Sequence, residues 1–389
     1  MIFKTAFKNI TGAGKRTWLN VAVLSFTFVL MTGYNGILDG WREEARRDTQ
    51  LWESGAGQIW HPAFDRYDIF TLSDAHGPPP ESLLPYIQNK SLTPILVTQG
   101  VLYPQGRMIN VQLKGIDPQQ SVVNIPSFNL YFNENEPQIV IGVRTAEATK
   151  LKEGDRVMVR WRDKYGAFDA REVVVSAIFQ TTVATVDAGQ IWINLSQLQQ
   201  MTLMQDEATY LVASNDFPPQ SDTGTWIYKE LSFLLADIDL LIKGGRVESI
   251  VIFSILLALA LLAVFDTQTL SIFRRQKEIG TYIALGMTPR KVMFLFTLEG
   301  TCYSLLAVLT SFVWGIPALT WFAHTGYPMP EMVNQMGMAI GNVLYPVFKL
   351  SSITVSIIVV VGLSAVISLL PARKIARLSV VYALKGKVI

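Results

Sequence analysis

Four long apolar stretches constrain the fold of this chain more than any other feature of its sequence. A helix that crosses the hydrocarbon core of a bilayer needs about 20 apolar residues. Charged residues make up 16% of the 389 residues, against about 25% in ordinary soluble domains. Because backbone groups in lipid must be hydrogen-bonded within the chain, we expect four membrane-spanning helices. Their predicted bounds are 17–38, 247–273, 292–322 and 351–371.

The distribution of Lys and Arg around these spans predicts their orientation, because short basic segments stay in the cytoplasm. Segments 1–16, 274–291 and 372–389 are rich in Lys and Arg, whereas 39–246 holds 18 Lys and Arg against 26 Asp and Glu. We therefore expect both termini and the 274–291 loop in the cytoplasm, with 39–246 and 323–350 outside. The first span is longer than the apolar region of a cleavable signal, so we expect it to remain as an anchor.

The external segment 39–246 has the pattern of a mixed α/β domain. Short runs rich in Val and Ile, separated by Gly and Pro turns, predict strands. The clearest unit is a strand at Ile139–Ile141, a short helix at Thr145–Leu151, and strands at Arg156–Arg162 and Glu172–Phe179. Charged helical patterns at both ends continue into the first two spans, which predicts a helical stalk. The segment contains no cysteine, so its stability must come from a hydrophobic core.

The loop 274–291 is more structured than a plain connector needs to be. Residues 277–285 have a helical composition with apolar side chains along one side. Gly286 occupies the place of a residue that ends a helix, and Thr288 and Pro289 suit the start of the next one. The pattern predicts a short amphipathic helix, a sharp turn and a fresh membrane helix. From periodicity alone, the apolar side fits the lipid interface as well as a cytoplasmic partner.

The residues of this loop resemble the coupling segment of FtsX-like ABC permeases, in which Arg-x-x-Glu-Ile-Gly-x-x-x-Ala-x-Gly is characteristic. The matching residues are Arg275, Glu278, Ile279, Gly280, Ala284 and Gly286. The C-terminal stretch "LPARKIARLSVVYALKG" is similar to the ending of the same family. The external stretch "IGVRTAEATKLKEGDRVMV" is similar to the external domain of lipoprotein-releasing (Lol-type) and MacB-type permeases.

The resemblance implies a transmembrane subunit that moves no substrate through a channel of its own. In this family two cytoplasmic ATPases close on ATP, the coupling helices move with them, and the stalks carry that motion to the periplasmic domains. We therefore expect an ABC ATPase dimer and a second permease, either another copy or a paralogue. Only 16 residues precede the first span in this sequence, so we expect the ATPase to be a separate protein.

The ATPase-coupling role is expected to fall on one set of residues in and beside the loop helix. In this hypothesis Glu278 reaches polar groups of the ATPase, while Ile279 and Ile283 bury apolar surface against it. The expected coupling residues are Arg275, Glu278, Ile279, Gly280, Ile283, Ala284 and Gly286.

Three functions are compatible with the resemblance, and each places the chain in the inner membrane of a two-membrane envelope. The first is extraction or mobilisation of lipoproteins or lipids, with a soluble periplasmic carrier. The second is an FtsX-like scaffold that relays ATPase motion to a periplasmic hydrolase, and the third is a MacB-like exporter with an adaptor and an outer-membrane duct. The external segment is larger than the insert typical of the hydrolase-regulating subgroup, which favours the first function over the second.

Two carboxylates, Asp266 and Glu299, fall inside predicted spans, where ionised groups are costly and therefore become functional candidates. Asp266 lies near the cytoplasmic end of its span. Its position there fits pairing with Arg274 or Arg275 as well as it fits a mechanistic role. Glu299 lies two turns into the third span, and we expect it to face the helix bundle. We prefer a packing and hydrogen-bonding role for Glu299 over a proton relay.

No motif in the sequence indicates catalysis or a cofactor in this chain. The stretch "TGAGKRT" resembles a phosphate-binding loop, but Asn9 and Arg16 stand where the motif requires Gly and Ser or Thr. The three histidines lack the spacing of metal ligands. We expect no catalytic, cofactor or metal site and no nucleic-acid partner, with ATP and Mg²⁺ bound by the partner ATPase.

Overall fold

The computed structural model describes residues 15–134, 136–328 and 343–373. Nearly all of the predicted basic N-terminal segment and tail, and half of the predicted loop 323–350, lie outside the described residues. The chain divides into two compact units. The helical unit comprises Met1–Trp41, Leu241–Tyr327 and Leu344–Ile389, and the α/β unit comprises Arg42–Leu240 and Pro328–Val343.

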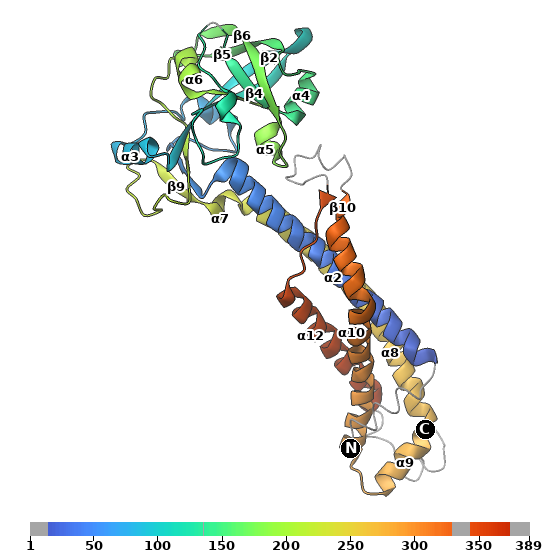
Figure 1. Cartoon of the computed structure of the whole chain (residues 1–389). Helices are drawn as coiled ribbons and strands as arrows, with labels where there is room; N and C mark the ends of the chain where they lie inside the picture. Colours follow the sequence, from blue (N-terminus) through green and yellow to red (C-terminus); the bar gives the residue numbers. More distant parts are fainter. Residues whose placement is uncertain (1–14, 135, 329–342, 374–389) are drawn as a thin grey trace. The chain divides into compact units, whose positions relative to one another are not determined.

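Among the described residues, four helices are long and apolar enough to cross a membrane (Figure 1). They are α2 (Lys15–Thr49), α8 (Ala236–Arg274), α10 (Pro289–Thr325) and α12 (Leu350–Ala372). This confirms the predicted four spans, with a large domain between the first and the second. Helices α2 and α8 extend past the apolar stretches into the sequence of the α/β unit, because charged helix-forming residues follow the first span and precede the second.

The helices of the helical unit pack through a core of apolar side chains that is supplemented by small and polar residues. Val21, Leu24 and Phe28 of α2 belong to the same buried cluster as Leu257 and Val264 of α8. Tyr303 and Ala307 of α10 and Val360 of α12 complete this cluster. Apolar side chains are as well solvated by lipid as by a neighbouring helix, so the hydrophobic effect does not drive membrane helices together. Close packing and interhelical hydrogen bonds stabilise their association instead.

Interhelical hydrogen bonds join α2 to its neighbours at two levels. Ser25 Oγ lies 2.9 Å from Ser311 Oγ of α10, and Trp314 Nε1 donates to Ser25 Oγ at 2.8 Å. Nearer the start of α2, Asn20 Nδ2 donates to Thr267 Oγ1 of α8 at 2.8 Å. These bonds fix the rotation of α2 against both helices, since a polar group turned toward lipid would lose its partner.

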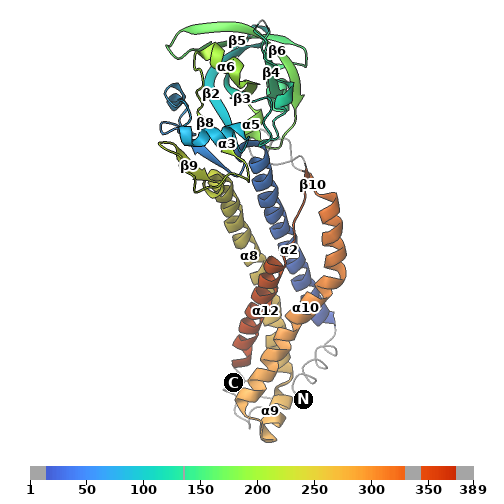
Figure 2. The ribbon, with the colours of Figure 1, turned by 60° about the vertical axis from the view of Figure 1, so that its left-hand side comes forward.

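The α/β unit is built on a nine-stranded sheet in the order β3-β7-β4-β6-β5-β2-β8-β1-β9. Its long strand β2 (Leu92–Tyr103) pairs along one edge with β3 (Ile109–Ile116), and along the other with β5 (Arg156–Arg162) and β8 (Tyr210–Ala213). Because β2 and β3 are paired directly, six of the strands form a closed ring of pairings. Figure 2 shows β2, β5 and β6 curving around this unit.

The remaining elements of the α/β unit are short. The other strands are β1 (Gly57–Trp60), β4 (Gln138–Gly142), β6 (Phe168–Phe179), β7 (Gln190–Asn194) and β9 (Ile227–Glu230). The short α-helices are α3 (Leu84–Gln88), α4 (Val143–Thr149), α5 (Ala184–Asp187), α6 (Leu195–Thr202) and α7 (Leu231–Leu234). Single turns of other helix types lie at η1 (Gln50–Ser54), η2 (Ile69–Ser73), η3 (Glu81–Leu83), η4 (Pro104–Gly106) and η5 (Ser127–Asn129). The two-residue strands β10 (Tyr327–Pro328) and β11 (Val343–Leu344) pair with each other.

The sequence-predicted unit of strand, helix and two strands is confirmed as β4, α4, β5 and β6. Strand β6 starts at Phe168, four residues earlier than predicted, because it pairs with β5 to the end of that strand, where Arg162 lies opposite Phe168. Strand β4 pairs in parallel with β6 and antiparallel with β7. Both faces of the sheet are covered, so the unit has two main apolar cores, one around Trp161 and one around Trp192.

Candidate coupling site

The loop between the second and third spans contains a short helix, α9 (Gln276–Ala284), which ends at a defined turn. Gly286 has a φ of 92°, a left-handed conformation that glycine adopts without steric cost. The Gly286 amide donates to the Ile283 carbonyl and the Met287 amide to the Tyr282 carbonyl, each at 3.0 Å. These two bonds form the Schellman motif, which confirms the prediction that Gly286 ends this helix.

The next helix, α10, begins where the sequence predicts but without the predicted side-chain cap. Pro289 occupies its first turn and Thr288 its N-cap position. The Thr288 hydroxyl makes no capping hydrogen bond. The sharp turn between α9 and α10 therefore depends on Gly286 and Pro289 rather than on the threonine side chain.

Helix α9 packs its apolar side against its own chain. Ile279 is 0% exposed and belongs to a buried cluster with Ile272 of α8, Val292 and Phe296 of α10, and Ala372. This contradicts the expectation that Ile279 buries apolar surface against the ATPase, since no surface remains for a partner. Its burial instead stabilises the attachment of α9 by about 1.5–3 kcal/mol. Ile283, which was expected to act in the same way, is partly buried against the same cluster.

Arg275 lies at the junction of α8 and α9 and bridges two carboxylates. Its Nε donates to Glu278 Oε2 at 2.7 Å, and its Nη1 donates to Glu299 Oε2 at 3.0 Å. The guanidinium also stands 4.9 Å from the centre of the Phe296 ring. Burial alone would lower the pKa of Arg275, but the bond to Glu278 and the charge of Glu299 raise it, so the guanidinium stays charged.

Glu299 lies buried inside the helical unit, with 5% of its side chain exposed. Its ion pair with Arg275 joins the start of α9 to the third turn of α10. Removing one partner of a buried pair leaves an uncompensated charge, which costs about 3–5 kcal/mol. The carboxylate is thus engaged in holding α9 to α10, which agrees with a packing and hydrogen-bonding role.

The opposite side of α9 is exposed. We call this surface the coupling face, and its residues are Lys277, Glu278, Thr281, Ala284 and Leu285. The Glu278 side chain is 56% exposed although it accepts from Arg275, and Leu285 is 79% exposed. Gly280, in contrast, is buried. The coupling face combines charged, polar and apolar side chains on a helix whose other side is fixed.

Asp266, the second carboxylate in a predicted span, is not part of this network. Its side chain is exposed on α8, and Arg275 pairs with Glu278 and Glu299 instead. Across residues 15–134, 136–328 and 343–373, Asp266 has no ion pair, with Arg274 or any other cation. The proposed pairing of Asp266 with either arginine is therefore absent from the described part of the chain.

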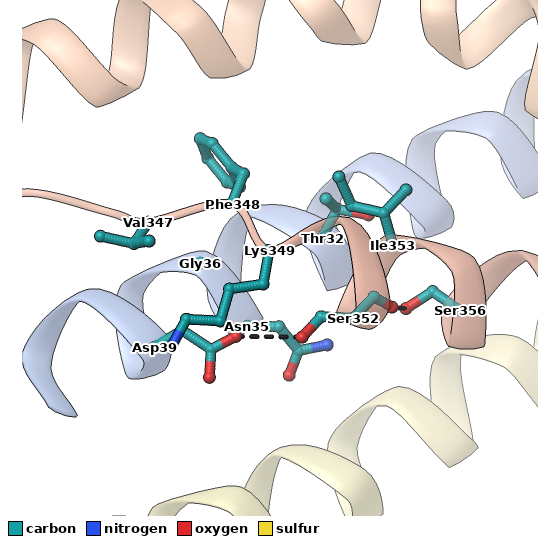
Figure 3. A pocket seen from close by; sticks show the side chains of 10 residues that line it. All are labelled: Thr32, Asn35, Gly36, Asp39, Val347, Phe348, Lys349, Ser352, Ile353 and Ser356. Atoms are coloured by element: carbon teal, nitrogen blue, oxygen red, sulfur yellow. Dashed lines mark hydrogen bonds between the residues drawn. The ribbon is translucent and has the colours of Figure 1, made fainter. Parts of the chain in front are cut away.

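A second polar junction joins three helices of the helical unit, and sequence reasoning missed it. Asp39 of α2, with 6% of its side chain exposed, accepts from Arg246 Nη2 of α8 at 2.8 Å and from Ser352 Oγ of α12 at 3.1 Å. Figure 3 shows Asp39 and Ser352 facing each other beside a pocket of about 10 Å³, the space of a single water molecule. We call these three residues the Asp39 clamp.

Two glycines of α2 allow the chain before α12 to pass close to this helix (Figure 3). A Cβ atom at Gly36 would collide with the Phe348 ring, and one at Gly40 with the Tyr345 carbonyl. The Gly36 carbonyl accepts from the Val347 amide at 2.9 Å. The spacing of four residues between these glycines was the one sequence signal that could have indicated this close contact.

The histidines of the described part of the chain form no candidate metal site. This part of the chain contains no group of three or more His, Cys, Asp or Glu side chains arranged to hold a metal ion. His76 Nδ1 lies 2.5 Å from Glu207 Oε2, and Lys164 Nζ donates to the other oxygen of Glu207 at 2.5 Å. This arrangement is an ion-pair network within the α/β unit.

Comparison with known protein families gives a match over part of the helical unit. Residues 250–380 match the model of the FtsX-like permease C-terminal family. The matched range includes α9, α10 and α12, with Arg275, Glu278 and Glu299. No curated protein matches the chain. The family match supports an ABC transporter permease of the FtsX/MacB type, which is a multi-pass, non-catalytic membrane subunit that works with a cytoplasmic ATPase.

Proposed function

We propose that this chain is a permease subunit that transmits ATP-driven motion from a separate cytoplasmic ATPase dimer to its α/β unit, and so extracts or mobilises lipoproteins or lipids from the inner membrane. The ATPase would contact the coupling face, and ATP and Mg²⁺ would be bound by that partner. A second copy of the chain or a paralogue would complete the transporter.

The observation that carries the proposal is the attachment of α9. Its inner side is fixed to α8 and α10 by the buried Ile279 and by the Arg275–Glu299 pair, while its outer side is free. A force applied to α9 therefore reaches both helices without first bending a flexible loop. Helix α8 continues for 39 residues, about 58 Å at 1.5 Å per residue, and its first residues belong to the α/β unit.

The proposed orientation follows from charge. The α9 segment carries Arg274, Arg275, Lys277, Arg290 and Lys291, which favours the cytoplasmic side. The α/β unit is acidic and lies in the chain between the first two spans, which favours the periplasmic side. Both termini are then cytoplasmic, and the unit that meets lipoproteins or a soluble carrier is outside.

The assignment to lipoproteins or lipids rests on the resemblance of the β4–α4–β5 stretch to Lol-type and MacB-type external domains. This stretch forms part of the closed ring of strands, and the unit carries its own hydrophobic cores. A self-supporting external domain is suited to bind a carrier or a lipidated protein while the membrane helices move. A hydrolase or an outer-membrane adaptor as the partner would instead indicate the scaffold or exporter function.

Reconstitution tests the proposal. The chain is placed in proteoliposomes with its ATPase and a triacylated lipoprotein, and lipoprotein in the soluble fraction is measured with and without ATP. We expect ATP-dependent release from vesicles that contain the wild-type chain and none with Glu278→Lys. ATP hydrolysis that is stimulated by the chain without any release of lipoprotein or lipid would contradict the substrate assignment and leave the permease assignment standing.

A further inference from the structure

The α/β unit contains a cavity of about 200 Å³ that the coupling mechanism does not use. Its wall combines apolar side chains such as Trp60 and Phe64 with polar groups from several strands, among them Lys114, Gln190 and Tyr210. Ligand pockets in proteins are typically about 300–1,000 Å³ and mostly apolar, with a few polar groups that orient the ligand. At about 200 Å³ this cavity lies below that range, so it has room only for a very small ligand.

Lys114 of β3 is the unusual member of this wall. It is 5% exposed and lies on the same face of its strand as Ile116, among the residues of an apolar core. Its ammonium stands 5.2 Å from the centre of the Trp192 ring. Over the described residues it has neither a hydrogen bond nor an ion pair. Burial lowers the pKa of Lys114 to about 8. At neutral pH its side chain is therefore still charged in most molecules.

A buried charge without a partner is costly, and proteins normally pair it. In the described part of the chain, none of the other charged residues of the wall forms an ion pair with Lys114. Glu53 accepts from the Thr185 hydroxyl at 2.7 Å, and Arg66 Nη1 donates to the Leu234 carbonyl at 3.1 Å. Glu53 raises the pKa of Lys114 and Arg66 lowers it, but both effects are smaller than that of burial. Lys114 therefore lacks a direct ion-pair partner among the described residues, although carboxylates line the same cavity.

Gln190 provides a second, independent indication of a ligand. Its Oε1 atom is buried and has no hydrogen-bond partner among the described residues, while its Nε2 donates to the Thr185 carbonyl. Gln190 lines the same cavity as Lys114. Burial also raises the pKa of Tyr210, so its hydroxyl keeps its proton and can donate. The wall thus contains an ammonium and a hydroxyl that can donate to an anion, whereas the buried Gln190 Oε1 can only accept from a donor.

We propose that this cavity binds a small organic monocarboxylate, whose carboxylate pairs with the Lys114 ammonium and whose apolar body lies against Trp60 and Phe64. Three carboxylates, those of Glu53, Asp65 and Asp68, also line the cavity. Their repulsion acts on any anion, but it disfavours a dianion such as phosphate about twice as strongly as a monocarboxylate. The apolar part of the wall favours an organic anion over an inorganic one.

Direct binding to the full chain in nanodiscs tests this proposal, with phenylacetate as the probe and phenylacetamide as its neutral counterpart. Equilibrium dialysis should show saturable binding of phenylacetate at one site per chain. Phenylacetamide and inorganic phosphate should each bind at least tenfold more weakly. Lys114→Met should weaken phenylacetate binding by at least tenfold, whereas the control Lys152→Met, at an exposed site, should leave it unchanged.

Thermal unfolding separates loss of the site from loss of the fold. Lys114→Met removes a desolvated charge at nearly constant volume, so we expect its α/β unit to unfold at the same or a higher temperature. Absence of phenylacetate binding by the wild type, or equal binding by Lys114→Met, would overturn the proposal. Phosphate binding that equals or exceeds that of phenylacetate would also overturn it.

Discussion

Replacement of Arg275 by methionine should detach α9 from the helical unit. The substitution keeps an unbranched side chain but removes the guanidinium, and with it three hydrogen bonds, two of them to the buried Glu299. The lost bond to Glu278 is worth little, because that carboxylate is more than half exposed. The main cost is the buried Glu299 carboxylate left without its cation, which amounts to about 3–5 kcal/mol.

This cost should appear as faster hydrogen exchange rather than as global unfolding. An opening of α9 that becomes about 3 kcal/mol easier raises amide exchange by roughly two orders of magnitude, since each 1.4 kcal/mol is a factor of ten. Amide exchange of residues 276–284 is measured by mass spectrometry on the full chain in nanodiscs. Exchange in the α/β unit serves as the internal reference and should not change.

A double substitution gives the matched control. Arg275→Met combined with Glu299→Leu removes both charges, and replacement of a buried pair by apolar residues is often neutral or stabilising. The double variant should therefore recover most of the protection of α9. Unchanged exchange in Arg275→Met would refute the argument that this pair fastens α9, and so would equal exchange in the single and double variants.

Three further predictions follow from other parts of the structure. Ala284→Trp on the coupling face should abolish co-purification of the ATPase in detergent while the chain still inserts and folds; retained co-purification would speak against docking there. Gly40→Ala should lower the free energy of unfolding by about 1–3 kcal/mol, because its Cβ would overpack against the Tyr345 carbonyl, and thermal unfolding should show a lower midpoint. The control Gly244→Ala, whose Cβ meets open space, should show no such decrease. The pKa of Lys114 is about 8 in the folded chain, against the ordinary 10.5. Between pH 8 and 10.5 the unfolded chain therefore binds more protons than the folded chain. The unfolding free energy of the α/β unit should thus rise by at most about 3 kcal/mol from pH 8 to 10.5, and Lys114→Met should abolish this rise.

The spans and the end of α9 could be predicted from sequence because the deciding physics is local. A membrane helix needs an uninterrupted apolar run whatever surrounds it, and Gly286 marks a backbone conformation that other residues adopt only at a cost. The β4–α4–β5–β6 unit was predictable for a similar reason, since turn residues separate its short runs. Each of these features depends on a few consecutive residues.

The contacts of the coupling site were not predictable, because they join residues that are distant in sequence. Periodicity shows that Ile279 lies on an apolar side of α9, but it does not say whether a partner, lipid or the chain itself covers that side. The pairing of Arg275 with Glu299 spans 24 residues and requires the turn at Gly286 to fold α10 back beside α9. The Asp39 clamp likewise depends on how three separate helices meet.

Lys114 shows the same limit inside the sheet. A lysine in a strand ordinarily marks a solvent-facing side, because alternate residues point to opposite faces. The closed ring of strand pairings and the segments packed around it leave neither face of β3 open, so Lys114 becomes buried among apolar residues. Neither the burial nor the unpaired Gln190 Oε1 has a signature in the sequence.

Site-specific photo-crosslinking at the coupling face tests the central claim most directly. A photoreactive phenylalanine analogue replaces Leu285, and a matched variant carries it at Val313 of α10, which is also exposed but lies within a predicted span. Irradiation of intact cells should crosslink position 285 to an ABC ATPase, identified by mass spectrometry through its phosphate-binding loop sequence. Position 313 should give no such product. Lipid adducts alone at position 285, in cells where the chain and the ATPase are both present, would contradict the account and place α9 in the lipid interface.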